Sequence, residues 1–186
     1  GVTTATRAAT RTPRGGAATL HVDYPRIGTE RDRPFADASE HPVARRRNEW
    51  SSVDEMFNRF RSRHPFSLWR EDVLHDYCEY GIVPTLNGFE LGCPPVVEAS
   101  IYMGSAGYSI DDAIKAVKHP VSVMRAFRDE SDRTEMDFSQ SPTWPELAGA
   151  FEHGHDIHLP DLTHFIPMQR PELVAKEVRR HANTVQ

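Results

Sequence analysis

From about residue 120 to the end of the chain, short apolar segments alternate with helical ones, and this alternation constrains the fold more than any other feature. Val121–Met124 and Asp156–Leu159 have the length and side chains of short strands. Trp144–Phe151 and Pro171–His181 have the pattern of helices. Strands joined through helices pair in parallel, and the helices cover the sheet. We therefore predict an α/β fold with a βαβα unit over residues 120–186.

The middle of the chain, residues 35–119, favours helices. Ser52 and Glu55 have the spacing of a capping box, and an amphipathic stripe of apolar side chains follows them. That stripe consists of Val53, Met56, Phe57 and Phe60. Ser67–Tyr80 repeats the pattern, and Cys93-Pro94-Pro95 opens a further helix, since proline is tolerated in a first turn. An Asn-Gly turn signal at residues 87–88 interrupts what we otherwise expect to be an all-helical segment.

Residues 1–34 differ from the rest of the chain. Gly1–Thr19 consists mostly of Ala, Thr, Arg and Gly, with almost no large apolar side chain. Such a segment buries too little surface to offset the entropy lost on ordering its backbone. We expect it to be disordered, with a short strand at Leu20–Tyr24. Two origins stay open: a native segment, or the product of an altered reading frame or a misplaced start.

Composition argues against several classes of function. With 186 residues, 38% of them hydrophobic, the chain can bury one sizeable core. Its net charge is −5. Nothing in that acidic balance favours nucleic acid or an anionic membrane. No apolar run approaches the roughly 18 residues that span a bilayer. With two cysteines and no apolar secretory leader, we expect a cytoplasmic protein that binds neither nucleic acid nor membrane.

The last 65 residues or so resemble the C-terminal third of an α/β-hydrolase. The resemblance rests on a strand ending in Val123-Met124-Arg125-Ala126, a second strand, and Thr163-His164-Phe165 before a helix opened by Pro171-Glu172. In that family the last two strands deliver the acid and the histidine of a Ser/Asp/His triad. His164 matches the family's histidine, which implies a general base towards the nucleophile and then a general acid towards the leaving group.

The acid has three candidates. Asp129 is the first, because Arg125-Ala126-Phe127-Arg128-Asp129 is similar to the family's Arg-Gly-x-x-Asp pattern, with alanine in place of glycine. Its role would be to hold the imidazole in the right tautomer. Asp132 and Asp137 lie in the same polar loop and stay open as alternatives.

A serine nucleophile with the family's Gly-x-Ser-x-Gly elbow does not occur in this sequence. The nearest match is Met103-Gly104-Ser105-Ala106-Gly107, where methionine occupies the first glycine position. Only 24 positions separate Ser105 from Asp129, and a helix expected over Ser109–Lys118 uses ten of them. The crossovers between an elbow and the acid need a dozen or more residues each. We therefore interpret Ser105 as a loop residue.

The resemblance implies a partial α/β-hydrolase fold: a helical cap over residues 35–119, then the C-terminal part of the parallel sheet over residues 120–186. Full relatives hydrolyse an ester, amide or similar bond of a small molecule. Others hydrolyse haloalkanes or epoxides with an aspartate nucleophile, and both reactions stay open for this chain. Without an elbow, we expect this chain to be weakly active or inactive. The alternative is a non-catalytic binding protein on a reduced hydrolase fold, and a strand edge left unpaired would favour self-association.

Three stretches of the middle segment are similar to the helical cap of such hydrolases: Arg45–Trp50, Pro65–Trp69 and Cys93–Ala99. A cap walls the substrate pocket, so we expect Trp50, Trp69 and Tyr102 to contact substrate. The alternative is that these aromatic side chains hold the cap helices together.

No metal or other cofactor is expected. His153, His155 and His158 could in principle bind a metal with Asp156, but these residues lack a helical HExxH frame or a cysteine pair. The sequence also lacks a Gly-rich phosphate loop.

Overall fold

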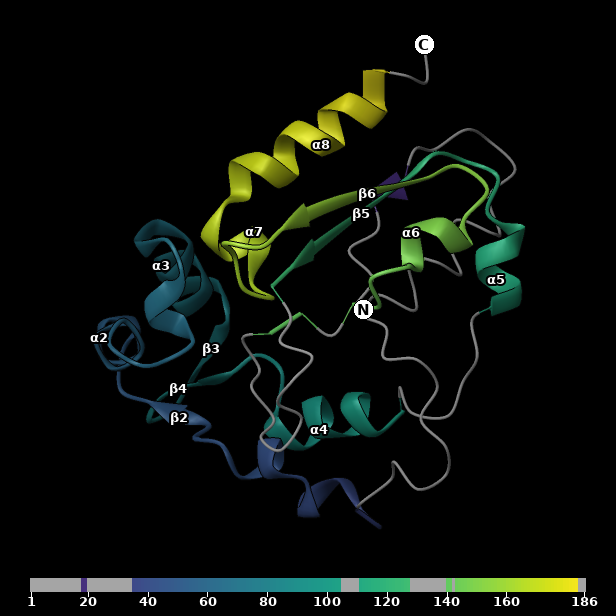
Figure 1. The fold of residues 1–186 in the computed structure, drawn as a ribbon. Coiled ribbons are helices and arrows are strands. Elements are labelled where there is room, and N and C mark those ends of the chain that lie inside the picture. The colour runs from purple at the N-terminus through teal and green to yellow at the C-terminus, as the bar shows by residue number, and fades with distance from the viewer. Residues whose placement is uncertain (1–17, 20–34, 105–110, 128–139, 142, 184–186) are drawn as a thin grey trace. The chain divides into compact units, whose positions relative to one another are not determined.

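The chain divides into two compact units, seen here in a computed structural model (Figure 1). The first contains residues 1–26 and 109–186, and the second contains residues 27–108. The structure describes residues 18–19, 35–104, 111–127, 140–141 and 143–183. The strand expected at Leu20–Tyr24 lies outside these ranges, as do nearly all of residues 1–34, for which disorder is expected. No helix in the described ranges is long and apolar enough to cross a bilayer.

The first unit contains a three-stranded parallel sheet in the order β1-β5-β6. Its strands are β1 (Ala18–Thr19), β5 (Val121–Ala126) and β6 (Gly154–Leu159). β5 and β6 pair along their full length, with Val121 beside Gly154 and Ala126 beside Leu159. This parallel pair confirms the predicted α/β class, and both strands are two residues longer than predicted.

Helices cover both faces of β5 in this unit (Figure 1). They are α5 (Asp111–Ala116), α6 (Leu147–Ala150), α7 (Ile166–Gln169) and α8 (Pro171–Asn183). Val121 and Val123 lie in one apolar cluster with buried residues of α5 and α6. Met124 and Ala126 lie in another with Ile166 of α7 and apolar residues of α8. Since alternate residues of a strand face opposite sides, both faces of β5 are apolar and its sequence reads as a nearly continuous apolar run.

The second unit contains a three-stranded antiparallel sheet in the order β2-β4-β3. Its strands are β2 (Glu49–Trp50), β3 (Ile82–Thr85) and β4 (Gly88–Leu91). The expectation of an all-helical middle segment is therefore wrong. The Asn-Gly signal marks a true hairpin between β3 and β4, and Gly88 has a φ of 141°, which favours glycine. The short apolar pieces on either side of that turn were too brief to show a strand period.

The second unit also contains three α-helices among its described residues. They are α2 (Val53–Phe60), α3 (Glu71–Tyr80) and α4 (Pro95–Gly104), with single 3₁₀ turns at η2 (Ala38–Glu40), η3 (Pro42–Arg45) and η4 (Phe66–Leu68). α2 begins as predicted: the Ser52 hydroxyl accepts from the Glu55 N–H at 3.0 Å, and the Glu55 carboxylate accepts from the Ser51 N–H at 2.9 Å. The helix predicted from Ser67 begins only at Glu71, because Trp69 and Arg70 have extended backbones.

Candidate active site

His164 lies in the loop between β6 and α7, beyond the carboxyl end of a parallel strand. Its side chain is half-buried, with its ring centroid 5.2 Å from that of Phe165. The amide oxygen of Gln169 accepts from the N–H and the hydroxyl of Thr163, at 2.8 and 2.7 Å. The fully buried Ile166 fixes the other end of the loop in the apolar core. Side-chain hydrogen bonds and packing thus both define the backbone that carries His164.

The loop that follows β5 begins beside the His164 loop. The Phe127 N–H donates to the carbonyl oxygen of Leu162 at 3.1 Å, and the Ser141 N–H donates to the carbonyl of Phe127 at 2.9 Å. Two residues after Phe127 comes Asp129, the first candidate for the acid. Asp129, Asp132 and Asp137 all lie outside the described residues, as does Ser105. The carboxyl ends of neighbouring parallel strands are where α/β folds hold their reactive groups.

A second polar group in this unit was missed by the sequence reasoning. Ser122 on β5 lies 2.8 Å from Nε2 of His181 on α8, and its hydroxyl also donates to Glu177. The Arg180 guanidinium donates to the Ser122 hydroxyl at 2.9 Å and to Glu177 at 2.6 Å. Two features of the sequence could have indicated this group. Ser122 stands between two core valines, and Glu177, Arg180 and His181 share one face of a helix.

This group contains a serine, a histidine and a carboxylate, but it does not have the geometry of a catalytic triad. In a triad the serine and the acid contact opposite nitrogens of the imidazole. Here Ser122 and Glu177 both approach Nε2 of His181, and Ser122 and His181 are only 0% and 1% exposed. We interpret the group as a buried polar connection between strand and helix.

Solved structures with similar folds cover nearly the whole chain. E-2-(acetamidomethylene)succinate hydrolase has a TM-score of 0.64 at 14% identity, covering 97% of this chain and 62% of its own. The thioesterase domain from the curacin biosynthetic pathway has a TM-score of 0.64 at 12% identity. That match covers 96% of this chain and 63% of the thioesterase domain. The peroxisomal α/β-hydrolase Lpx1 of Saccharomyces cerevisiae has a TM-score of 0.67 at 14% identity. That match covers 98% of this chain and 50% of Lpx1. The chain has part of an α/β-hydrolase fold. It spans about half to two-thirds of the length of these three structures.

Sequence comparisons add nothing to this assignment. No protein-family model matches the chain, and no curated protein matches it either. At 12–14% identity, the structural matches establish the α/β-hydrolase fold and leave the reaction to be argued from the residues.

The three aromatic residues expected to contact substrate all lie in the second unit. Trp50 is 3% exposed within the apolar core, and it lines a pocket of about 330 Å³. Trp69 is half-buried and packs on that same core, in an edge contact with Tyr77 at 5.4 Å. Tyr102 is 51% exposed and stacks on His41 at 5.7 Å. Trp50 and Trp69 thus contribute to holding the unit together.

The histidines weighed as metal ligands do not gather around one point. His155 lies on the opposite face of β6 from Asp156 and His158, because successive side chains of a strand alternate between its two faces. The Asp156 carboxylate is held by the Arg125 guanidinium, with N–O distances of 2.8 and 2.9 Å. Within the described residues, clustered ligand atoms occur at His75, Asp76 and Glu79 of α3, all of them exposed.

Proposed function

We propose that this chain carries the histidine-bearing part of a hydrolase that cleaves an ester, amide or similar bond of a small molecule. The observation that supports this most is the hydrogen bond between Phe127 and Leu162 at 3.1 Å. This bond joins the loop after β5 to the loop after β6, and these two strands are parallel neighbours. The loop after β6 holds His164, and the chain after β5 continues to Asp129. In an α/β-hydrolase the histidine and the acid of the triad come from two such loops.

In this proposal His164 takes a proton from the nucleophile as it attacks the substrate carbonyl, and returns it to the leaving group. A carboxylate accepts a hydrogen bond from the other ring nitrogen and stabilises the imidazolium. Asp129 is our first candidate, with Asp132 and Asp137 as alternatives. Since the sequence contains no Gly-x-Ser-x-Gly, we propose that residues 1–186 alone have little or no activity, and that turnover requires a nucleophile from a further segment.

The first experiment uses the chain as it is. A fluorophosphonate probe and a series of p-nitrophenyl acyl esters should give no stoichiometric labelling and a rate close to background. Labelling that maps to Ser105 would overturn our interpretation of that residue as a loop position.

The second experiment supplies the nucleophile. All reading frames of the flanking genomic DNA are translated, and any segment with Gly-x-Ser-x-Gly is co-expressed with this chain. The pair should hydrolyse the esters, and His164→Ala should lower kcat by about a thousandfold or more. His158→Ala, which changes an exposed histidine on β6, is the matched control. A fully active His164→Ala pair would contradict the proposal, and asparagine variants of the three aspartates would identify the acid.

One observation favours a second function, a non-catalytic interaction protein. Among the described strands, β6 is the outer strand of its sheet and has no partner on its far side. An open edge can pair with a strand of another chain, including a second copy. A monodisperse monomer in light scattering would contradict self-association, and a flanking sequence without an elbow would favour this alternative over the hydrolase.

A further inference from the structure

The second unit contains a pocket of about 330 Å³ whose lining residues all lie between positions 46 and 91. Its apolar lining belongs to the core of that unit and consists of Trp50, Phe60, Phe66, Tyr77 and Leu91. Phe60 and Phe66 stack with ring planes 3° apart at 4.2 Å, and Trp50 meets the edge of Phe60 at 5.2 Å. These ring contacts make a preformed apolar surface. Pockets for small ligands span roughly 300–1,000 Å³, so this one suits a small ligand.

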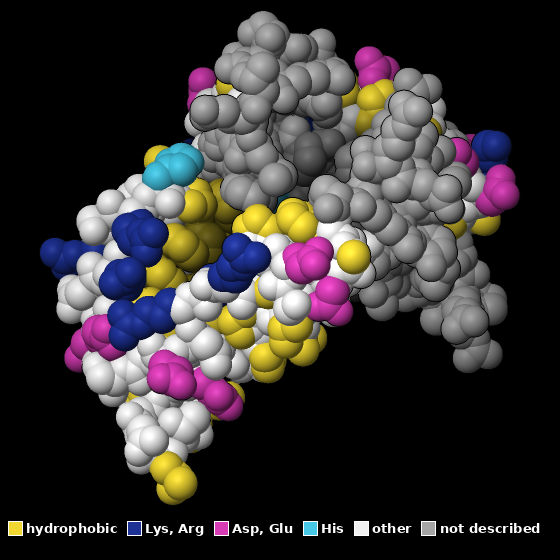
Figure 2. Space-filling view, turned by 90° about the horizontal axis from the view of Figure 1, so that it is seen from below, with side chains coloured by type: hydrophobic (Ala, Val, Ile, Leu, Met, Phe, Trp, Pro, Cys, Tyr) yellow, Lys and Arg dark blue, Asp and Glu magenta, His cyan; other side chains and the backbone are white. Residues whose placement is uncertain are grey.

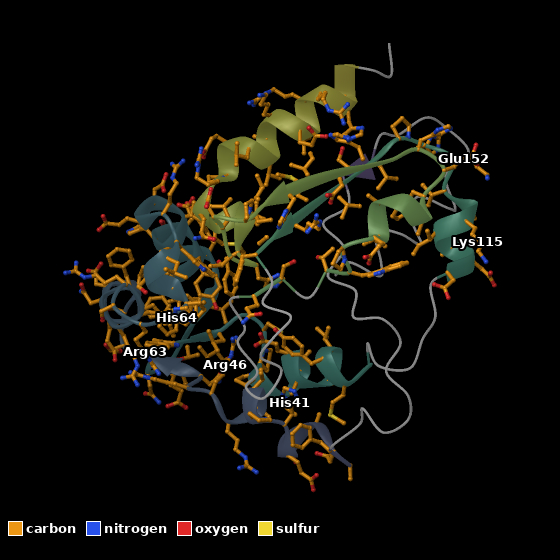
Figure 3. All side chains as sticks on the ribbon, viewed as in Figure 1. His41, Arg46, Arg63, His64, Lys115 and Glu152 are labelled. Atoms are coloured by element: carbon orange, nitrogen blue, oxygen red, sulfur yellow. The ribbon has the colours of Figure 1, made fainter. Side chains whose placement is uncertain are left out.

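The remaining lining residues are all basic: Arg46, Arg47, Arg59, Arg63 and His64. Figure 3 shows Arg46, Arg63 and His64 beside one another near α2 and β4. Basic side chains also gather beside exposed apolar surface in the space-filling view (Figure 2). No carboxylate belongs to the lining, so the pocket combines an apolar interior with a positive rim.

Two of these arginines already have carboxylate partners. Arg46 forms an ion pair with Glu98 at 2.8 Å, and Arg47 forms one with Glu55 at 2.6 Å. Arg59 and Arg63 are exposed, and neither guanidinium has an ion-pair partner among the residues that the structure describes. Both line the same pocket, so in the absence of an anion their like charges repel each other.

Two residues of the lining also carry a buried hydrogen-bond donor without an acceptor. Nε1 of Trp50 and Nε of Arg46 have none within the described part of the chain. A buried donor left without a partner costs free energy, and most such donors in proteins are satisfied by protein, water or ligand. Both residues line the pocket, although these two atoms have no accessible surface of their own.

We propose that this pocket binds a small amphiphilic anion, with an apolar chain or ring on the aromatic surface and a carboxylate or phosphate head at the arginines. Guanidinium groups bind both heads through paired, charge-assisted hydrogen bonds. The proposal rests on residues 27–108 alone, so it does not depend on the hydrolase proposal or on His164.

Isothermal titration calorimetry with the full chain tests this site. Octanoate and octyl phosphate should bind, and the tighter of the two identifies the preferred head. 1-Octanol, which lacks the charge, and inorganic phosphate, which lacks the chain, should bind at least about tenfold more weakly. Binding of the two anions should weaken as salt is raised, because the rim arginines are exposed.

Exposed arginines in one segment provide matched variants. Arg59→Gln with Arg63→Gln should weaken octanoate binding about tenfold or more, whereas Arg61→Gln removes a charge between them that does not line the pocket and should leave binding unchanged. All three positions are exposed, so we expect each variant to fold. The proposal is overturned if neither anion binds at millimolar concentration, if 1-octanol binds as tightly, or if Arg61→Gln weakens binding as much as the double change.

Discussion

The hydroxyl of Ser122 lies 2.8 Å from Nε2 of His181, although 59 positions separate the two residues in the sequence. Together with Glu177 and Arg180, this contact joins the central strand β5 to the terminal helix α8. Ser122 and His181 are almost completely buried, whereas the Arg180 side chain is 49% exposed. Loss of one buried member should be costly, because the buried polar atoms that remain cannot turn to water instead. Two predictions concern this buried group.

Ser122→Ala should lower the free energy of unfolding by about 1–3 kcal/mol, because it removes one hydrogen-bond partner from the buried polar atoms of Glu177 and His181. Urea denaturation followed by circular dichroism measures this. Lys118→Ala is a suitable control, since it breaks an exposed ion pair with Glu152 in the same unit and should change stability little. Equal effects of the two substitutions would show that the buried group contributes no more to stability than an exposed ion pair.

Stability should fall on acidification in two steps. Burial lowers the pKa of His181 below 6.5, so the unfolded chain binds a proton first and stability decreases as the pH falls below about 6.5. The hydrogen bond from Arg180 lowers the pKa of Glu177 from 4.5 to about 2, so its contribution is present above pH 4.5 and is lost between 4.5 and 2. That second loss is about 3 kcal/mol at most.

Denaturation curves at pH 8, 5.5 and 3.5 measure both steps. His181→Gln should remove the dependence below pH 6.5, and Glu177→Gln should remove the step below pH 4.5. If Glu177→Gln loses as much stability as the wild type between pH 5.5 and 3.5, the low pKa of Glu177 is not the source of that loss.

The two cysteines should differ sharply in reactivity. Cys78 is 0% exposed in the core of the second unit, and burial raises the pKa of its thiol to about 11. Cys93 is exposed. The native protein should therefore react with one equivalent of 5,5′-dithiobis(2-nitrobenzoate) quickly and with a second only after unfolding. Cys93→Ser should abolish the fast phase, and two fast equivalents in the native chain would contradict the burial of Cys78.

Two glycines should respond to alanine in opposite directions. Gly88 has a φ of 141°, and an added Cβ would lie 2.5 Å from the carbonyl oxygen of Trp50. Gly88→Ala should therefore destabilise the chain by about 2 kcal/mol or more. At Gly149 in α6 an added Cβ meets no atom within 4 Å, so Gly149→Ala should stabilise it by up to about 1 kcal/mol. Thermal unfolding measures both, and a stable Gly88→Ala variant would argue against the turn geometry at that position.

Local patterns in the sequence predicted the elements that depend on near neighbours. The cap at Ser52, the turn at Asn87-Gly88, strands β5 and β6, and helices α6 and α8 follow from residues within a few positions of one another. The delayed start of α3 was missed because an extended backbone at Trp69 and Arg70 leaves no mark on apolar spacing. The antiparallel sheet was missed for a similar reason, since β2 has two residues and its partner lies about forty positions away.

The sequence by itself determined the α/β class of the C-terminal part and the position of His164 after its second strand. Capping, turn chemistry and apolar periodicity are local properties, so the order of residues is enough to show them. Only the tertiary structure decided that Ser122 meets His181 and that five basic residues surround one aromatic pocket. Those groupings depend on which faces of separate elements pack together, and spacing along the chain does not indicate that packing.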